Sequence, residues 1–370
     1  MIILADNGKK IYVLHIVGAR PNFMKAAPVM RALARYPELS QKLVHTGQHY
    51  DANMSEIFFR QLGLPAPDFN LEVGSGSHAW QTAQIMMRFE EIVLQERPNL
   101  VLVYGDVNST VAAALVCAKL GIPVGHVEAG LRSFDRTMPE EINRLITDQI
   151  ADLLFTPSQD GNDNLIGEGV APEKIHLVGN VMIDTLVHLL PSVNGRCRQE
   201  LHLEPKKFAL VTLHRPSNVD DRERFAAILK TLDTISRNLT CVFPVHPRTR
   251  ARLQEWDLAI PDESRLRLLE PLGYLDFLGL MQEAALVITD SGGIQEETTF
   301  LGIPCLTLRK NTERPITVGV GTNILVGEDL EHLENETQAI LNGTGKTGGV
   351  PPLWDGKAGE RIAEIVCEYL

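Results

Sequence analysis

The stretch IPVGHVEAGLRSFDRTMPEEINR, residues 122–144, joins an apolar strand that ends at Val127 to a helix that starts at Pro139. The charged side chains between 126 and 144 are Glu128, Asp135, Glu140, Glu141, Arg132, Arg136 and Arg144. A strand followed by a helix is the unit of an α/β fold, and ligands of such folds bind beyond the carboxyl ends of the strands. The loop is therefore either a solvated segment with weak surface ion pairs or part of a binding site.

The same alternation of apolar strands and helical segments runs along the whole chain. In the first half, strands are expected at 11–17, 43–46, 100–104, 123–127, 153–156 and 175–178, with helices at 25–35, 78–95 and 109–120. In the second half, strands are expected at 208–213, 241–245, 267–269, 286–289, 305–308 and 323–326. Continuous apolar strands between helices indicate an α/β protein with parallel sheets that are covered on both faces.

A polar segment at 189–207, rich in turn-forming residues, separates the two sets of strands and predicts a domain boundary. We expect one domain at 1–190 and a second at 191–356, with the amphipathic helix 357–370 assigned to the first domain. A chain of 370 residues fits two domains, because single hydrophobic cores stop growing at about 250–300 residues.

Composition excludes several classes of function. The net charge of −12 argues against nucleic-acid binding and against binding to an anionic membrane surface. No apolar run is long enough to span a membrane, and the first ten residues do not resemble a signal peptide, so a cytoplasmic protein is expected. The five cysteines form no CxxC pair and the histidines form no HExxH motif, which predicts no metal site.

Two glycine motifs resemble cofactor loops without their context. GSGSHA at 74–79 matches GxGxxA, but the residues before it are too few and too polar for a Rossmann strand, so no nicotinamide cofactor is expected. GTGKT at 343–347 ends like a phosphate-binding loop, but Ile340 stands where that motif needs glycine. We interpret both as ordinary connections and predict no cofactor.

Two strand-to-helix turns suit an anionic ligand. In IVGARPNFMK, residues 16–25, Arg20 and Lys25 stand at a helix start, where cations oppose the helix dipole and backbone N–H groups favour an anion. In VITDSGGIQEE, residues 287–297, the glycines let a helix start approach a diphosphate, and Glu297 lies one turn further on. The alternative is that both are ordinary tight turns.

Three further polar residues follow predicted strands. His214 and His246 stand at strand ends in the second domain, and each could be a structural histidine or a ligand contact. Asp106 follows the strand 100–104 and precedes a helix, so it could serve as a helix cap or as a functional acid.

Together these segments resemble the UDP-N-acetylglucosamine 2-epimerase family of the non-hydrolysing type. The matching segments run in family order over nearly the whole chain: GARPNFMK, TGQHYD, YGDVNST, HVEAGLRSFDRTMPEEINR, LHRPSNVD, PVHP, DSGGIQEE and TERP. The resemblance implies two Rossmann-like domains that face each other across a cleft, as in GT-B glycosyltransferases. It also implies a terminal helix that returns to the first domain, and a homodimer.

The resemblance assigns roles to individual residues. It implies that the catalytic residues are Asp106, Glu128, Glu140, His214 and Lys25. It implies that substrate is bound by Arg20, Arg144, His246, Phe277, Ser291, Gly292, Gly293, Glu297 and Arg314. Of these, His214 would also hold the diphosphate with Arg20 and 291–293, Glu297 would take the ribose, and Phe277 would contact uracil.

The implied reaction inverts C2 of UDP-N-acetylglucosamine through elimination of UDP to a 2-acetamidoglucal and re-addition. It needs acid and base groups on two faces of the sugar and stabilisation of the departing UDP. Some members carry an allosteric substrate site beside a glutamine that matches Gln48. This chain has Pro216 where such members have arginine, which leaves that regulation open.

Several alternatives share these motifs. GARPNFMK and LHRPSNVD also resemble epimerases of UDP-2,3-diacetamido glucuronic acid. A hydrolysing epimerase that releases UDP and N-acetylmannosamine would use the same residues. A GT-B glycosyltransferase and a nucleotide-sugar sensor without catalysis are more distant alternatives.

Overall fold

The computed structural model of the chain describes residues 11–48, 62–261 and 263–370. The amino-terminal stretch judged above for a signal peptide, and the end of the TGQHYD segment from His49 onward, therefore lie outside the described residues. The chain divides into two compact units: unit 1 is Met1–His188 with Pro352–Leu370, and unit 2 is Leu189–Pro351.

Unit 1 is built on a seven-stranded sheet whose described pairings are all parallel, in the order β3-β2-β1-β4-β5-β6-β7. Its strands are β1 (Ile11–Val17), β2 (Leu39–His45), β3 (Phe69–Asn70), β4 (Leu100–Tyr104), β5 (Val124–Val127), β6 (Leu153–Thr156) and β7 (Ile175–Leu177). The central strand β4 is buried along its whole length, as its run of Leu, Val and Tyr side chains predicts.

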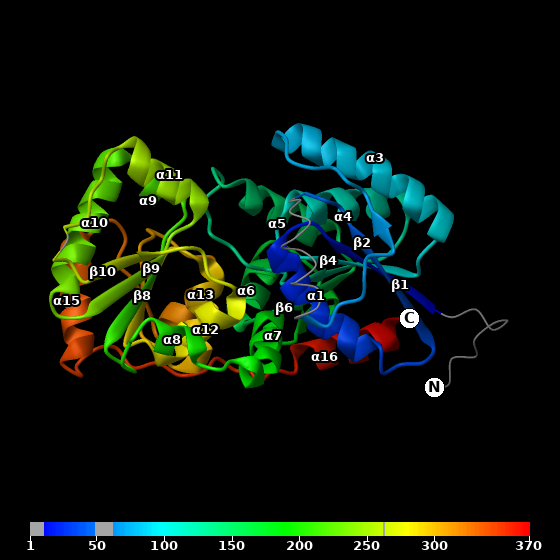
Figure 1. Ribbon diagram of the computed structural model, residues 1–370. Helices are drawn as coiled ribbons and strands as arrows, with labels where there is room; N and C mark the ends of the chain where they lie inside the picture. Colours follow the sequence, from blue (N-terminus) through cyan, green and yellow to red (C-terminus); the bar gives the residue numbers. More distant parts are fainter. Residues whose placement is uncertain (1–10, 49–61, 262) are drawn as a thin grey trace. The chain divides into compact units, whose positions relative to one another are not determined.

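Helices cover both faces of this sheet. They are α1 (Arg20–Leu33), α3 (His78–Glu96), α4 (Asn108–Leu120), α5 (Pro139–Ile150), α6 (Gln159–Gly167), α7 (Val181–Leu189) and α16 (Ala358–Tyr369), with a 3-10 turn η2 (Pro172–Lys174). Figure 1 shows α3, α4 and α5 on one face and α1 and α16 on the other. Apolar side chains of α3 and α4 pack on the strands to form the core of that face.

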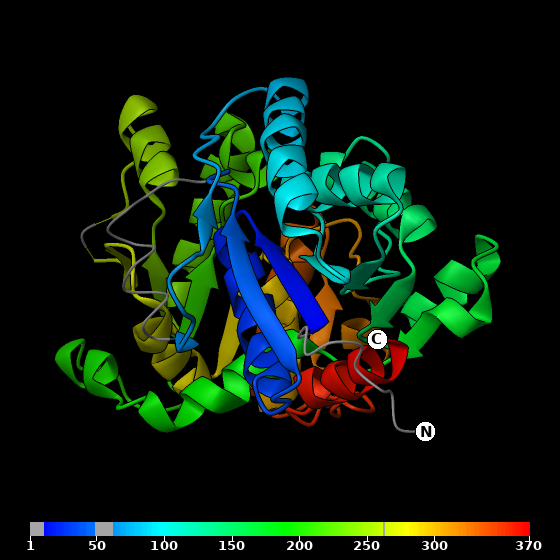
Figure 2. The same cartoon turned by 90° about the vertical axis from the view of Figure 1, so that its right-hand side faces the viewer.

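The carboxyl-terminal helix α16 belongs to unit 1 and packs against α1 (Figure 2). A side chain at Gly359 would lie 2.8 Å from the carbonyl group of Pro28, so glycine permits this close contact. The carboxylate of Asp184 on α7 accepts hydrogen bonds from the N–H groups of Ala358 and Gly359 at 3.0 and 2.7 Å. These bonds satisfy backbone donors that a helix start would otherwise leave open.

Unit 2 repeats the scheme with a six-stranded parallel sheet, in the order β10-β9-β8-β11-β12-β13. Its strands are β8 (Phe208–Thr212), β9 (Thr240–Pro244), β10 (Leu266–Leu269), β11 (Leu286–Thr289), β12 (Cys305–Thr307) and β13 (Asn323–Leu325). Its helices are α8 (Arg196–Glu200), α9 (Pro216–Val219), α10 (Arg222–Ser236), α11 (Pro247–Glu255), α12 (Tyr274–Glu283), α13 (Gly292–Leu301), α14 (Pro315–Gly319) and α15 (Leu330–Leu341), with the 3-10 turn η3 (Leu190–Ser192). Helices α10 and α15 lie on one face of the sheet, and α12 and α13 on the other (Figure 1).

The expected α/β class with two Rossmann-like domains is confirmed by these two sheets. Some local expectations were wrong. Helix α1 begins at Arg20 rather than at Lys25, because Pro21 suits a first helical turn and Asn22 accepts bonds from the N–H groups ahead of the helix. Strand β2 begins at Leu39 rather than at Leu43, because its polar half still pairs with β1 in register.

In the part of the chain that the structure describes, no helix has both the length and the apolar character needed to cross a membrane. Among the same residues, no group of three or more His, Cys, Asp or Glu side chains is arranged to hold a metal ion.

Candidate active site

In unit 1 the predicted site residues lie at the carboxyl ends of strands or in the helix turns nearby. They are Arg20 and Lys25 on α1, Gln48 after β2, Asp106 after β4, Glu128 after β5, and Glu140 and Arg144 on α5. Strands β2, β1, β4 and β5 are consecutive neighbours in the sheet. Parallel strands end at the same edge, so this set gathers where an α/β sheet binds ligands.

The structure joins Lys25 and Glu128 in a buried ion pair. Glu128 adopts a left-handed backbone conformation with φ of 74°, which is uncommon for a residue other than glycine and costs on the order of 1–3 kcal/mol. A side chain at Gly105, in the turn after β4, would lie 2.6 Å from Nζ of Lys25, so only glycine fits. Buried charge and backbone strain at one strand end mark a functional position better than they explain stability.

The second charged pair links Asp106 to Arg144. Nε and Nη2 of Arg144 lie 3.0 and 2.9 Å from Oδ2 of Asp106. The neighbouring Asn143 donates from its side-chain nitrogen to the backbone oxygen of Asp106 at 2.8 Å. The side chain of Asp106 remains 27% exposed, whereas that of Glu128 is 4% exposed. Of the two carboxylates, Asp106 is therefore the one that solvent reaches.

Glu141 is a residue of this cluster that the sequence interpretation named without a role. It is buried and pairs with Arg144, and it accepts hydrogen bonds from the backbone N–H groups of Ser133 and Phe134 at 3.0 and 2.9 Å. Glu140, which was assigned a catalytic role, lies in the first turn of α5 and is partly exposed. The three-residue spacing of Glu141 and Arg144 on a helix was the available signal.

The start of α1, where an anion site is predicted, is held by the side chain of Asn22. Asn22 uses its side-chain oxygen to accept from the N–H groups of Gly18 and Ala19 at 3.1 and 3.0 Å. Its nitrogen donates to the backbone oxygen of Tyr104 at 2.7 Å. These two N–H groups are thus engaged within the protein, and Lys25 pairs with the carboxylate of Glu128. The role of Arg20, which is exposed, stays a prediction.

Gln48 is buried and belongs to a separate network of polar side chains. Its side-chain oxygen accepts from the backbone nitrogen and the hydroxyl of Ser109 at 3.1 and 2.7 Å. Its backbone oxygen accepts from Gln81 at 3.2 Å. The structure thus gives Gln48 a packing role on α4, and its allosteric role stays a prediction.

In unit 2 the predicted residues surround Asp290, which the sequence interpretation left without a role. Its carboxylate accepts from the N–H groups of His214 and Arg215 at 3.1 and 2.9 Å, and from Asn218 at 3.0 Å. Nδ1 of His214 lies 3.0 Å from the same carboxylate. Burial would raise the pKa of Asp290, but His214 and these donors outweigh burial and lower it. Asp290 is therefore an ionised carboxylate, and its hydrogen bonds orient the half-exposed His214.

The helix start of α13 lies directly after Asp290 and holds Ser291, Gly292 and Gly293. A side chain at Gly292 would lie 2.5 Å from Nη1 of Arg314, whereas one at Gly293 would meet nothing within 4 Å. Gly292 therefore lets the guanidinium of Arg314 approach the helix start. His214 and Arg314 thus border a helix amino terminus, where backbone N–H groups favour an anion.

Two acidic residues form ion pairs with the guanidinium of Arg314. Its Nε lies 2.7 Å from Oε1 of Glu296, and Glu313 pairs with its Nη1. Glu313 is also 2.7 Å from Nη2 of Arg309. Sequence reasoning assigned no role to Glu296 or Glu313, although both stand in the quoted segments DSGGIQEE and TERP.

The remaining predicted residues of unit 2 lie near this group. His246 caps α11 by accepting from the N–H group of Arg248 at 3.3 Å. Burial lowers the pKa of His246, and the charges of His214 and Arg248 lower it further, as expected for histidines that follow the neighbouring strands β8 and β9.

Glu297 and Phe277 lie on the helices α13 and α12. Glu297 is buried and accepts a hydrogen bond from the hydroxyl of Tyr274 at 2.7 Å. Phe277 is partly buried on α12, the helix that Tyr274 begins. The hydroxyl of Tyr274 thus orients the carboxylate that the sequence assigned to the ribose.

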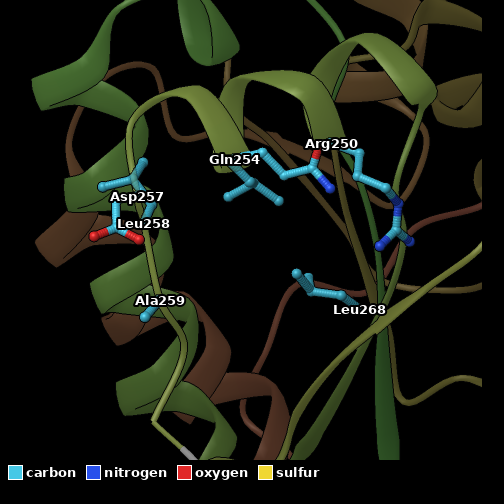
Figure 3. Close-up of a pocket in the computed structure, with 7 residues that line it drawn as sticks. Arg250, Gln254, Asp257, Leu258, Ala259 and Leu268 are labelled. Carbon is cyan, nitrogen blue, oxygen red and sulfur yellow. The ribbon is translucent and has the colours of Figure 1, made fainter.

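A pocket of about 280 Å³ lies elsewhere in unit 2, between α11 and β10 (Figure 3). Arg250, Gln254 and Leu268 are among the residues that line it, and none of the predicted site residues does. It therefore gives no support to the predicted site.

The two Rossmann-like units, one with paired carboxylates and one with a glycine-rich helix start beside a histidine and an arginine, are typical of an enzyme that acts on a sugar nucleotide. A family model described as UDP-N-acetylglucosamine 2-epimerase matches residues 31–367. The chain belongs to the UDP-N-acetylglucosamine 2-epimerase family and is a carbohydrate isomerase.

Individual relatives agree with this assignment. A Methanococcus maripaludis protein named UDP-N-acetylglucosamine 2-epimerase is 43% identical over 362 residues, covering 95% of this chain and 97% of that protein. A Pseudomonas aeruginosa protein named UDP-2,3-diacetamido-2,3-dideoxy-D-glucuronate 2-epimerase is 43% identical over 360 residues, covering 96% and 99%. The crystal structure of Methanocaldococcus jannaschii UDP-GlcNAc 2-epimerase in complex with UDP-GlcNAc and UDP superimposes with a TM-score of 0.88 at 43% identity, covering 97% of this chain and 100% of that one.

Proposed function

We propose that this chain converts UDP-N-acetylglucosamine to UDP-N-acetylmannosamine without hydrolysis. In the proposed reaction a base removes the proton from C2 while the bond between C1 and the UDP oxygen breaks, which leaves a 2-acetamidoglucal. UDP then adds back to C1, and C2 receives a proton on its opposite face. The reaction consumes no water and needs no cofactor.

The observation that carries this proposal is the pair of carboxylates on neighbouring strand ends, each with its own cation. Asp106 follows β4 and faces Arg144, and Glu128 follows β5 and faces Lys25. Two carboxylates in different surroundings can hold different protonation states, which an acid and a base on two faces of a sugar require. Lys25 can also carry a proton close to Glu128. Glu140 remains in the proposal as the third acid, on the exposed side of α5.

Unit 2 would stabilise the UDP that leaves. The helix start 291–293, His214, Arg314 and, from unit 1, Arg20 would receive the diphosphate, because such groups stabilise negative charge as it develops. Glu297 would accept hydrogen bonds from the ribose hydroxyls, and Phe277 would contact the uracil. His246 and Arg144 would complete the substrate contacts.

A second substrate has specific support. The Pseudomonas aeruginosa relative, which is as similar as the Methanococcus one, is named for a diacetamido glucuronate substrate. The same elimination and re-addition would act on that sugar, since both substrates carry a 2-acetamido group and a UDP at C1.

The assembly that we propose is a homodimer. Trp80, Met87 and Leu94 on α3 are 44%, 63% and 55% exposed and follow one another at seven-residue spacing. Such spacing places them on one stripe of the helix, the arrangement by which two helices pack. Light scattering should give the mass of two chains, and Met87→Glu should lower it to one. A monomeric parent protein would contradict this proposal.

The function is tested by proton and phosphorus NMR of the protein with UDP-N-acetylglucosamine in D₂O. The expected product is UDP-N-acetylmannosamine with deuterium at C2. Free N-acetylmannosamine and UDP would instead identify a hydrolysing enzyme. An unchanged spectrum would make the substrate wrong, and turnover of the diacetamido glucuronate would then establish the alternative. Failure with both sugars would overturn the proposed activity.

A further inference from the structure

The buried histidine His126 has hydrogen-bond acceptors on both sides of its ring. It lies on β5 and is fully buried. Its Nε2 is 2.7 Å from the backbone oxygen of Gly105, and its Nδ1 is 2.6 Å from Oδ1 of Asp148. A carbonyl oxygen carries no hydrogen, so Nε2 must donate.

The surroundings of Asp148 favour its ionised form. Its second oxygen accepts from the N–H group of Gly130 at 3.1 Å and lies 2.7 Å from Nη1 of the buried Arg132. A neighbouring guanidinium and a backbone donor both stabilise a carboxylate. We therefore expect Asp148 to accept the 2.6 Å hydrogen bond and Nδ1 of His126 to donate it.

The charges of this network balance. Arg132 is buried and forms a two-pronged pair with Glu168, at 2.8 Å from Nε to Oε1 and 2.6 Å from Nη2 to Oε2. A doubly protonated His126 and Arg132 supply two positive charges, and Asp148 and Glu168 supply two negative ones. Balanced pairs with saturated hydrogen bonds are the condition under which buried charges are tolerated.

The carbonyl group that His126 binds belongs to Gly105, in the turn after β4 at the candidate active site. Gly105 donates from its own N–H group to the backbone oxygen of Val127 at 3.0 Å, so β5 holds both polar groups of this residue. The turn has φ of +65° and passes against the Lys25–Glu128 pair. The next residue is Asp106. The His126 contact to the Gly105 carbonyl is thus one of the hydrogen bonds that place these groups, together with the Gly105 N–H bond to Val127 and the Asn143 bond to the backbone oxygen of Asp106.

We propose that His126 is a positioning residue, held as a buried imidazolium whose Nε2–H group fixes the Gly105 carbonyl and thereby the active-site turn. The proposal rests on the proposed function where it concerns turnover, but the protonation and the position of the turn can be measured without a substrate.

Two substitutions separate the two hydrogen bonds. In His126→Gln the amide nitrogen reaches as far as Nε2 and keeps a donor for Gly105. In His126→Asn the nitrogen reaches only as far as Nδ1 and serves Asp148 instead. If His126 positions the turn, kcat should fall about 10²-fold in the Asn variant and much less in the Gln variant, because small misplacements near the chemistry have effects of that size. UDP affinity should stay unchanged in both, since the proposed UDP contacts lie elsewhere.

Protonation is tested on the whole protein labelled with ¹⁵N-histidine. His126 should show two ring N–H protons, whereas a neutral imidazole ring carries one. The matched control is His15 on β1, equally buried, whose Nδ1 and Nε2 face Tyr104 and Gln41 at 2.6 and 3.0 Å. Burial lowers the pKa of His15 to about 4, although its bond to Gln41 opposes the shift, so it should show one ring N–H proton.

The position of the turn is read from the backbone amide signals of Gly105 and Asp106, which should move further in the Asn variant than in the Gln variant. A single ring N–H proton on His126 would overturn the proposal, and so would an Asn variant that matches or exceeds the Gln variant. A parent protein without turnover would overturn the proposed function, while the ring protons and the amide signals would still decide the role of His126.

Discussion

At the carboxyl ends of its strands, unit 1 presents carboxylates that face single cations, whereas unit 2 presents an aspartate whose acceptor sites are filled. Asp106 and Asp290 show the contrast, because β4 and β11 occupy the same place in the two strand orders. Asp106 is partly exposed beside Arg144, and Asp290 is fully buried among donors from three residues. An acidic residue that follows a buried strand can thus either transfer protons or accept hydrogen bonds that hold a loop in place. Only the groups around the carboxylate distinguish these two roles.

The largest effect is expected from Asp106→Asn. If unit 1 carries the acid and base groups, kcat should fall roughly 10²–10⁴-fold, the usual effect of losing a general acid or base. UDP affinity, measured by calorimetry, should change little. Asp135→Asn, in the charged loop between β5 and α5, is the control and should keep full turnover, because its carboxylate accepts from the N–H and hydroxyl groups of Thr137. Near-normal turnover of the Asp106 variant would exclude a catalytic role.

The corresponding test of unit 2 is Gly292→Ala. The new methyl group would collide with Arg314 at the start of α13. Overpacking of this kind costs about 1–3 kcal/mol, so UDP should bind roughly 10–100-fold more weakly. Gly167→Ala, on α6 in unit 1, adds the same methyl group where nothing lies within 4 Å and should bind UDP nearly as the parent does. Equal affinities of the two variants would contradict the diphosphate site.

A smaller effect is expected from Tyr274→Phe, which removes the hydrogen bond to Glu297. Such a bond to a charged group contributes about 1.5–3 kcal/mol at most, and Glu297 keeps its position on α13, so UDP affinity should fall only about tenfold. Steady-state kinetics should show a higher KM with kcat unchanged. A loss of kcat alone would mean that Glu297 takes part in the chemistry rather than in binding.

Asp184 should affect stability without affecting turnover. Burial raises its pKa from 3.8 to about 6, against the hydrogen bonds from the N–H groups of Gly359 and Ala358. The folded state therefore binds this proton more strongly, so the free energy of unfolding should decrease by about 3 kcal/mol as pH rises from about 4 to about 6. In Asp184→Asn this dependence should disappear from denaturant titrations. If the variant kept the same pH dependence as the parent, another group would be responsible.

Much of the fold could be predicted from local pattern. Strands β1, β4, β6 and β11 have the expected bounds, because each is a continuous apolar run bordered by turns. The two-residue strand β3 was missed, since so short an edge strand leaves no periodic signal. The early start of α1 was missed because Asn22, which satisfies the N–H groups ahead of that helix, is not an obvious cap.

The sequence by itself determined the α/β class, the two Rossmann-like halves and the family, because apolar periodicity and short ordered motifs are local properties. It also singled out Asp106, Glu128, His214 and Gly292. Only the tertiary structure decided which charges meet: Lys25 with Glu128, Arg144 with Asp106 and Glu141, and His126 with Asp148. These partners come from different strands and helices, so their pairing depends on the order of strands in the sheet, which no local pattern records.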